Sequence, residues 1–258
     1  WNLVANPFPS YIHGNTNADS SNNFLTVNTD KLHDSYEAIY GYDADGSGYT
    51  AYNNTSSALN LAPGQAFMVA SDNTSSDNIS FTTDMRTIEG GDDLIVGDIL
   101  EDTFELIIKL YDGDTELDYT KFYFADGLSL GLDPGYDAGN FNQGASLMSR
   151  LVEEDEGVGL VINAMGLENV NDVVVPLEIN RESGNSFRIS IDTFDIYAGT
   201  NVYLEDNVQG TMTLLNEQDF ELTPENNLSG VGRFFIHLTE TTFSIDNEVD
   251  TNLLNAYK

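Results

Sequence analysis

Apolar and polar residues alternate with a period of two along much of the chain, and this pattern limits what it can fold into. The clearest runs are Phe104-Leu106-Ile108-Leu110, Phe187-Ile189-Ile191 and Phe234-Ile236-Leu238. Such spacing places the apolar side chains on one face of an extended strand. Helical periodicity is weak, and the best helical candidates, 30–39 and 146–152, are too short to organise a core. The sequence therefore predicts an all-β fold.

Turn signals and one break in the strand pattern divide the chain. Glycine- and aspartate-rich clusters recur between the strands at the spacing that an antiparallel sandwich requires. Between about Arg86 and Asp93, two glycines and three acids interrupt the strand pattern. We predict two tandem antiparallel β-sandwich units, of jelly-roll or immunoglobulin-like type, at 1–88 and 89–243. Residues 244–258 are expected to form a linker.

The hydrophobic content is sufficient for two such cores. The chain has 258 residues, of which 40% are hydrophobic, with 13 Tyr and 14 Phe. Because each alternating run places its apolar members on one face, the runs also predict which side chains fill the second core. The predicted core residues are Phe104, Leu106, Phe187, Ile189, Phe234 and Ile236.

The charge balance argues against two classes of partner. The chain carries 9 Lys and Arg against 43 Asp and Glu, a net charge of −34, which repels nucleic-acid phosphates and anionic lipid surfaces. It has no run of about 18 apolar residues, so we expect no membrane insertion. It has no cysteine, which removes disulfides and thiolate catalysis. Most of the acids are interpreted as solvated surface residues.

One loop in the first half resembles part of a calcium site. Asp43, Asp45 and Ser47 stand at positions 1, 3 and 5 of a calcium loop, but Asn54 occupies position 12, where such loops place a bidentate Glu. Tyrosines also alternate on both sides of the loop, at Tyr40, Tyr42, Tyr49 and Tyr52. This alternation favours a β-hairpin over a cation site.

A second acidic loop carries Asp133 and Asp137. Pro134 and Gly135 would stiffen it, and clustered carboxylates in a chain this acidic would gain from a bound cation. Turn formation explains the same residues equally well. If calcium binds, we expect a structural ion either at Asp133 and Asp137 or at Asp43 and Asp45, and we expect no other cofactor. The histidines His13, His33 and His237 lack zinc-site spacing.

Tyrosine is concentrated in the first half of the chain. Tyr49 and Tyr52 are the candidate ligand-binding residues, because exposed tyrosine rings stack on sugars while their hydroxyls form hydrogen bonds. The alternative is that alternate tyrosines belong to the core, since tyrosine also favours strands. No nucleophile elbow or phosphate-binding glycine loop is present in the sequence. A carboxylate-pair hydrolase ranks third among our hypotheses.

Several motifs give the chain a family resemblance. The first half opens with WNLVANPFPS at 1–10 and continues with IYGYD at 39–43 and LAPGQAFMV at 61–69. The second half contains YDAG at 136–139, VPLEIN at 175–180, VYLED at 202–206 and GRFFIHL at 232–238. This ordered series resembles secreted Bacteroidetes surface and adhesin-like proteins, in the β-sandwich region that precedes a C-terminal sorting domain for type IX secretion.

The resemblance implies a location more strongly than an activity. It implies an extracellular protein, secreted or anchored at the outer-membrane surface, whose sorting domain would follow residue 258 and engage the type IX secretion machinery. No catalytic residue is carried over from it. We therefore predict a non-enzymatic adhesion or presentation module that contacts an extracellular glycan or protein surface. The alternative is a carbohydrate-binding module that accompanies a polysaccharide-degrading enzyme.

Overall fold

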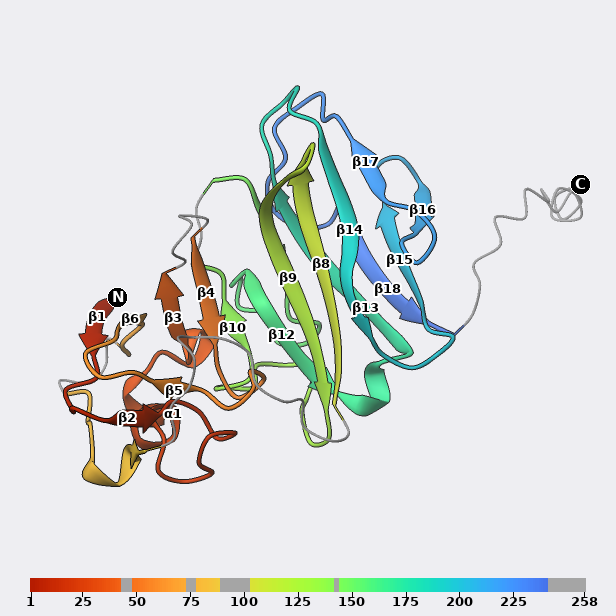
Figure 1. The fold of residues 1–258 in the computed structure, drawn as a ribbon. Coiled ribbons are helices and arrows are strands. Elements are labelled where there is room, and N and C mark those ends of the chain that lie inside the picture. Colours follow the sequence, from red (N-terminus) through yellow and green to blue (C-terminus); the bar gives the residue numbers. More distant parts are fainter. Residues whose placement is uncertain (43–47, 73–77, 89–102, 142–143, 241–258) are drawn as a thin grey trace, which may run out of the picture.

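The computed structural model describes residues 1–42, 48–72, 78–88, 103–141 and 144–240, and its fold is shown in Figure 1. Strands dominate it, which confirms the all-β prediction. Within these ranges the one α-helix is α1 (Phe24–Asn28), where the side chain of Asn23 caps the helix by accepting a hydrogen bond from the Thr26 N–H. No helix in the described ranges is long and apolar enough to cross a membrane.

The first half contains two small sheets. One has the strand order β1-β6-β3-β4 and the other β5-β2-β7. Short 3₁₀ turns connect them. The elements are β1 (Asn2–Ala5), β2 (Tyr11–His13), η1 (Thr29–Lys31), η2 (Asp34–Tyr36), β3 (Ile39–Tyr42), β4 (Tyr49–Tyr52), β5 (Asn60–Leu61), β6 (Ala66–Val69), η3 (Thr83–Met85) and β7 (Arg86–Thr87).

The second half forms one 11-stranded sheet with the order β16-β15-β18-β13-β11-β12-β9-β8-β14-β17, and β10 pairs with β12 beside it. This sheet curls towards a barrel, so that β13 and β18 pass behind β8 and β14 in Figure 1. Its elements are β8 (Phe104–Asp112), β9 (Thr115–Ala125), β10 (Ala138–Gly139), β11 (Ser146–Ser149), β12 (Leu160–Gly166), η4 (Leu167–Asn169), β13 (Asp172–Asn180), β14 (Phe187–Asp195), β15 (Asn201–Asp206), β16 (Thr211–Leu214), β17 (Phe220–Leu222) and β18 (Phe234–Thr239).

One strand pair differs from the antiparallel prediction. β12 runs parallel to β9, with Ile162 opposite Lys121 and Gly166 opposite Ala125. Parallel neighbours require a long crossover, and residues 126–159 provide one between these two strands. The helical candidate at 146–152 is also wrong, because its first residues form β11.

The predicted second core is confirmed. Leu106, Ile189 and Ile236 are completely buried, and Phe187 and Phe234 are nearly so. Phe104 packs against the same cluster from its edge. The alternation of each run therefore identified the correct face of its strand.

The first half relies more on asparagine side chains than on long strands. Asn15 is fully buried, and its amide nitrogen donates to the backbone carbonyls of Asn53, Ser56 and Ser57 at 2.9, 3.0 and 2.9 Å. Its side-chain oxygen accepts from the Leu59 N–H at 3.0 Å. Because buried backbone groups need partners, one amide here replaces the hydrogen bonds that a sheet would otherwise supply.

The predicted boundary lies where the structure is only partly described. Residues 89–102 are outside the described ranges, as is the predicted linker at 244–258. Within the described ranges, every sheet takes its strands from one side of this stretch only. The division into units at 1–88 and 89–243 stays a prediction.

Phe234→Ala should lower the free energy of unfolding by about 3–5 kcal/mol, because it removes a large buried ring from the second core. Phe194→Ala is the matched control, since that ring is 41% exposed and its loss should cost less than about 1 kcal/mol. Urea denaturation of both variants measures the difference. A cost below about 1 kcal/mol at Phe234 would show that this face does not form the core.

Candidate functional site

The two halves pack against each other through a shared apolar cluster, which we call the junction. Ala38, Tyr40 and Ala51 of the first half contact Ala138, Val161 and Ile162 of the second. In Figure 1, β10 lies between β4 of the first half and β12 of the large sheet. The junction therefore joins the four-stranded sheet to the large sheet.

The backbone of Gly139 is the closest point of contact. The ring of Tyr36 covers it so tightly that a Cβ atom at Gly139 would lie 2.1 Å from Cε1 of Tyr36. The Tyr40 hydroxyl donates to the Gly139 carbonyl at 3.0 Å. Burial raises the pKa of this phenol well above its usual value, so it keeps the proton that it donates. Only glycine leaves room for this approach.

The first half holds the loop before β10 through hydrogen bonds to the backbone carbonyls of that loop. The Asn53 amide donates to the carbonyls of Tyr136 and Asp137 at 2.6 and 3.3 Å. The Asn54 N–H donates to the Gly135 carbonyl at 2.9 Å. Gly135 has a φ of +79°, in the left-handed region that glycine tolerates best. Residues 133–137, the junction loop, are thus held by the turn that follows β4.

The junction loop contains the predicted calcium pair, and the structure shows the hydrogen bonds of both carboxylates. Asp137 is fully buried, and its two oxygens accept the N–H groups of Ala164 and Asp133, each at 2.7 Å. Asp133 accepts from the N–H and hydroxyl of Ser129 at 2.7 and 3.0 Å. Desolvation on burial raises the pKa of Asp137 to about 7 in spite of its two backbone donors. These hydrogen bonds stabilise a turn. Calcium binding at this pair stays a prediction.

The other candidate metal residues, Asp43 and Asp45, lie outside the described residues. Their flanking strands β3 and β4 do pair as an antiparallel hairpin, with Tyr42 opposite Tyr49, as the tyrosine alternation predicted. Across the described ranges, no group of three or more His, Cys, Asp or Glu is placed to hold a metal ion. His237 instead contacts Glu205, with 2.7 Å between Nε2 and a carboxylate oxygen.

Glu37 is a buried acid that sequence reasoning did not single out. Its side chain lies at the junction, where Oε1 accepts the Thr29 hydroxyl at 2.9 Å. Oε2 is buried without a hydrogen-bond partner in the structure. Desolvation raises the pKa of this carboxyl to about 7. The sequence signal that could have identified Glu37 is its position as a single acid in the otherwise apolar run from Tyr36 to Tyr40.

Six aromatic side chains at the junction form a chain of ring contacts, and we call them the aromatic belt. They are Trp1, Tyr36, Tyr40, Tyr42, Tyr49 and Phe141. Trp1 contacts Phe141 with ring centroids 4.0 Å apart, and Phe141 contacts Tyr49 at 4.7 Å. Tyr49 in turn meets Tyr42 edge to face at 5.2 Å. Because Phe141 belongs to the second half and the other five rings to the first, the junction assembles the belt.

Two belt rings are open to solvent. Tyr42 is 62% exposed and Trp1 is 46% exposed, while Tyr40 is buried. An exposed, contiguous group of aromatic rings on a folded surface is typical of an interaction site.

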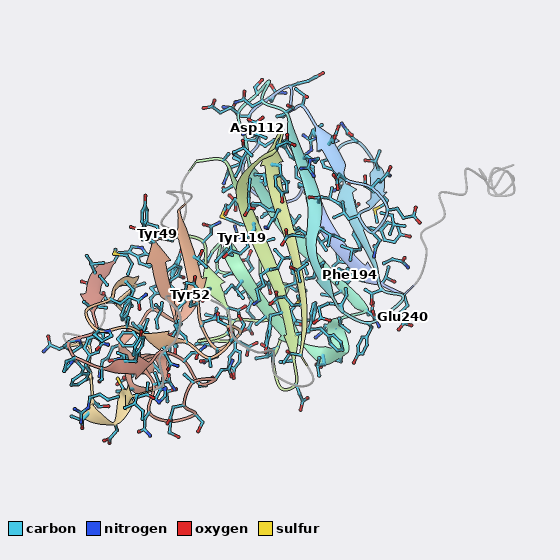
Figure 2. The ribbon with its side chains drawn as sticks, in the orientation of Figure 1. Tyr49, Tyr52, Asp112, Tyr119, Phe194 and Glu240 are labelled. Carbon is cyan, nitrogen blue, oxygen red and sulfur yellow. The ribbon has the colours of Figure 1, made fainter. Side chains whose placement is uncertain are left out.

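The two predicted ligand-binding tyrosines are separated by the strand that carries them. Tyr49 and Tyr52 occupy the two ends of β4, and both are labelled in Figure 2. Tyr49 packs with the junction, whereas Tyr52 packs against the core of the first half. The structure therefore places Tyr49 in the belt and Tyr52 on the opposite face. Trp1, Tyr42 and Phe141 join Tyr49, and sequence reasoning missed that grouping.

Comparison with known families supplies one match. A family described as a domain of unknown function (DUF8693) matches residues 1–238. The chain belongs to this family. The match spans both halves and the junction between them, so DUF8693 covers the whole belt. No curated protein and no solved structure matches the chain.

Gly139→Ala should disrupt the junction, because the new methyl group would occupy the position of the Tyr36 ring. Overpacking of this kind costs about 1–3 kcal/mol, which thermal unfolding measures. Gly131→Ala is the matched control, since its Cβ would have no atom nearer than 3.8 Å. Equal melting temperatures for the two variants would contradict this account of the junction.

Proposed function

We propose that this DUF8693 chain is a non-catalytic adhesion or presentation module of a secreted bacterial surface protein, and that the aromatic belt contacts its ligand. The exposure of Trp1 and Tyr42, on a surface that both halves build, carries this proposal. Aromatic rings supply large contact areas with little loss of conformational entropy, because few torsions become fixed on binding.

The scaffold supports the proposal because it holds the belt rings in fixed positions. β3 and β4 carry Tyr40, Tyr42 and Tyr49, and the junction ties them to the large sheet through Gly139. Sites held by strands and packed side chains are more rigid than sites on free loops. The proposal includes the finer arrangement of two tandem β-sandwich units, joined at this junction.

The support for an extracellular location comes from the motif series. The ordered motifs from WNLVANPFPS at 1–10 to GRFFIHL at 232–238 resemble those of type IX-secreted surface proteins. On this proposal the chain is exported by the type IX machinery and displayed at the outer-membrane surface. A module of this kind has neither a nucleic-acid partner nor a membrane-inserted segment, as the net charge of −34 favours.

A glycan is the ligand that the belt chemistry favours, which supports the second candidate, a carbohydrate-binding module attached to an enzyme. The rings of Trp1 and Tyr42 present apolar faces to stack on sugars, and the indole N–H and phenol O–H supply polar contacts at their edges. The acidity of the chain disfavours anionic polysaccharides, so a neutral glycan fits best.

The buried acids Glu37 and Asp137 bear on the third hypothesis. Both have a pKa raised to about 7, which is a feature that catalytic acids share. Glu37 is only 3% exposed and Asp137 is not exposed at all, so neither is presented to a polymer in this conformation. Their burial at the junction favours a structural role.

Tyr42→Ala and Trp1→Ala should each weaken binding to neutral polysaccharides about tenfold, the equivalent of about 1.4 kcal/mol, because each removes an exposed stacking ring. Polysaccharide arrays and pull-down assays at matched ionic strength measure the loss. Tyr197→Ala is the matched control, since Tyr197 is a 44% exposed tyrosine outside the belt. Binding that survives both belt variants unchanged, or no binding by the wild-type chain to any glycan or extracellular protein, would overturn the proposal.

A further inference from the structure

Glu37 occupies an unusual place for a carboxyl group. It follows Tyr36 of the belt directly and is only 3% exposed. Oε1 receives one hydrogen bond, from Thr29, while Oε2 is buried without a partner. An ionised carboxylate in this position lacks the solvation that water would give it. Ionisation of Glu37 therefore destabilises the packing of the segments that cover it.

The junction loop from the second half is part of that cover. A Cβ atom placed on Gly135 would lie 3.3 Å from Glu37 Oε1 and 3.0 Å from the side-chain nitrogen of Asn54. The Gly135 carbonyl also accepts the Asn54 N–H at 2.9 Å. The junction loop therefore packs directly against the carboxyl, and water can reach it if the loop lifts away.

The surrounding groups come from three neighbouring segments. Asp34, on η2 beside Glu37, is the acid whose charge acts on it. The turn after β4 contributes Asn54, and η1 contributes Thr29. The acids of the junction loop form their own hydrogen bonds, Asp133 with Ser129 and Asp137 with two backbone N–H groups; neither is among the charges that act on Glu37.

We infer that Glu37 is a protonation switch for the junction, whose neutral form holds the junction loop against the first half and whose ionised form loosens it. The belt responds because the same segment that covers Glu37 continues through Gly139 to Phe141, which contacts Trp1. Ligand binding by the belt is therefore strongest in mild acid. This last step rests on the proposed function of the belt, whereas the switch itself does not.

The sign follows from burial. Desolvation raises the pKa of Glu37 from 4.5 to about 7, the Thr29 hydrogen bond lowers it, and Asp34 raises it. A carboxyl whose pKa is raised on folding adds stability that is complete below its unfolded pKa of 4.5 and is lost as the pH rises through about 7. The junction is thus tight in mild acid and loosens above neutrality.

Trp1 reports on the junction without any ligand, since it is the only tryptophan in the chain and its ring lies against Phe141. We would follow its emission from about pH 5 to about pH 8.5 in the full chain. The wild type should show a red shift with a midpoint near pH 7, as the indole becomes more hydrated. Glu37→Gln, which fixes a neutral side chain, should make this transition smaller than in the wild type; Asp137, whose pKa is also raised to about 7, titrates over the same range in both proteins. Glu153→Gln, which removes the same charge from an exposed turn, should keep it.

Thr29→Val provides a second variant if Glu37→Gln does not fold. Loss of the hydroxyl removes the hydrogen bond that favours the charged form, so the emission midpoint should move to higher pH. Identical titrations in the wild type and Glu37→Gln, or an unmoved midpoint in Thr29→Val, would overturn the switch. If the emission responds as expected while no polysaccharide or protein ligand binds at any pH, the switch holds and the proposed function of the belt fails.

Discussion

The tyrosine pair that closes on Gly139 is the contact on which the other features of the molecule depend. The Tyr36 ring occupies the space where any other residue would carry a Cβ atom, and the Tyr40 hydroxyl bonds the same peptide. This contact joins β10 of the second half to the first half. It also buries Ala138 in the junction and places Phe141 against Trp1. Without it, the belt would lose its ring from the second half.

The belt lies where the two halves meet, so the arrangement of its rings depends on how the halves pack together. Five of its rings come from strands and turns of the first half, and the sixth comes from the segment that follows β10. The buried carboxyl of Glu37, which follows Tyr36 of the belt in the sequence, lies against Gly135 of the junction loop. A surface built from two parts changes when those parts separate. Ionisation of a buried carboxyl favours such a separation, because the charged form gains solvation when water reaches it.

Sequence periodicity predicted the features that depend on neighbouring residues. The alternation around Leu106, Ile189 and Ile236 identified the buried face of three strands, and alternating tyrosines identified the β3–β4 hairpin. The parallel pairing of β12 with β9 was not predicted in this way, because alternation indicates which face of a strand is buried but not the direction of the strand beside it. The buried amides of Asn15 and Asn53 were missed for a related reason, since a polar residue in a loop gives no sign of its burial.

The candidate site shows the same limit. Tyr49 lies in the belt, and its role in ligand binding stays a prediction. Tyr52 lies on the other face of the same strand, as residues three apart in a strand must. Asp133 and Asp137 illustrate that carboxylates suited to calcium are also suited to capping backbone N–H groups in a turn. Composition alone does not distinguish a calcium ligand from a residue that caps backbone N–H groups. The hydrogen-bond partners in the structure identify the capping role.

The central claim is that the two halves form one cooperative unit through the junction. Urea unfolding at about pH 6, followed both by Trp1 emission and by far-ultraviolet circular dichroism, tests it most directly. Trp1 reports on the junction, whereas circular dichroism is dominated by the strands of the large sheet. The account predicts that the two transitions coincide in midpoint and slope. A Trp1 transition complete at a lower urea concentration, with the circular dichroism signal still native, would contradict it.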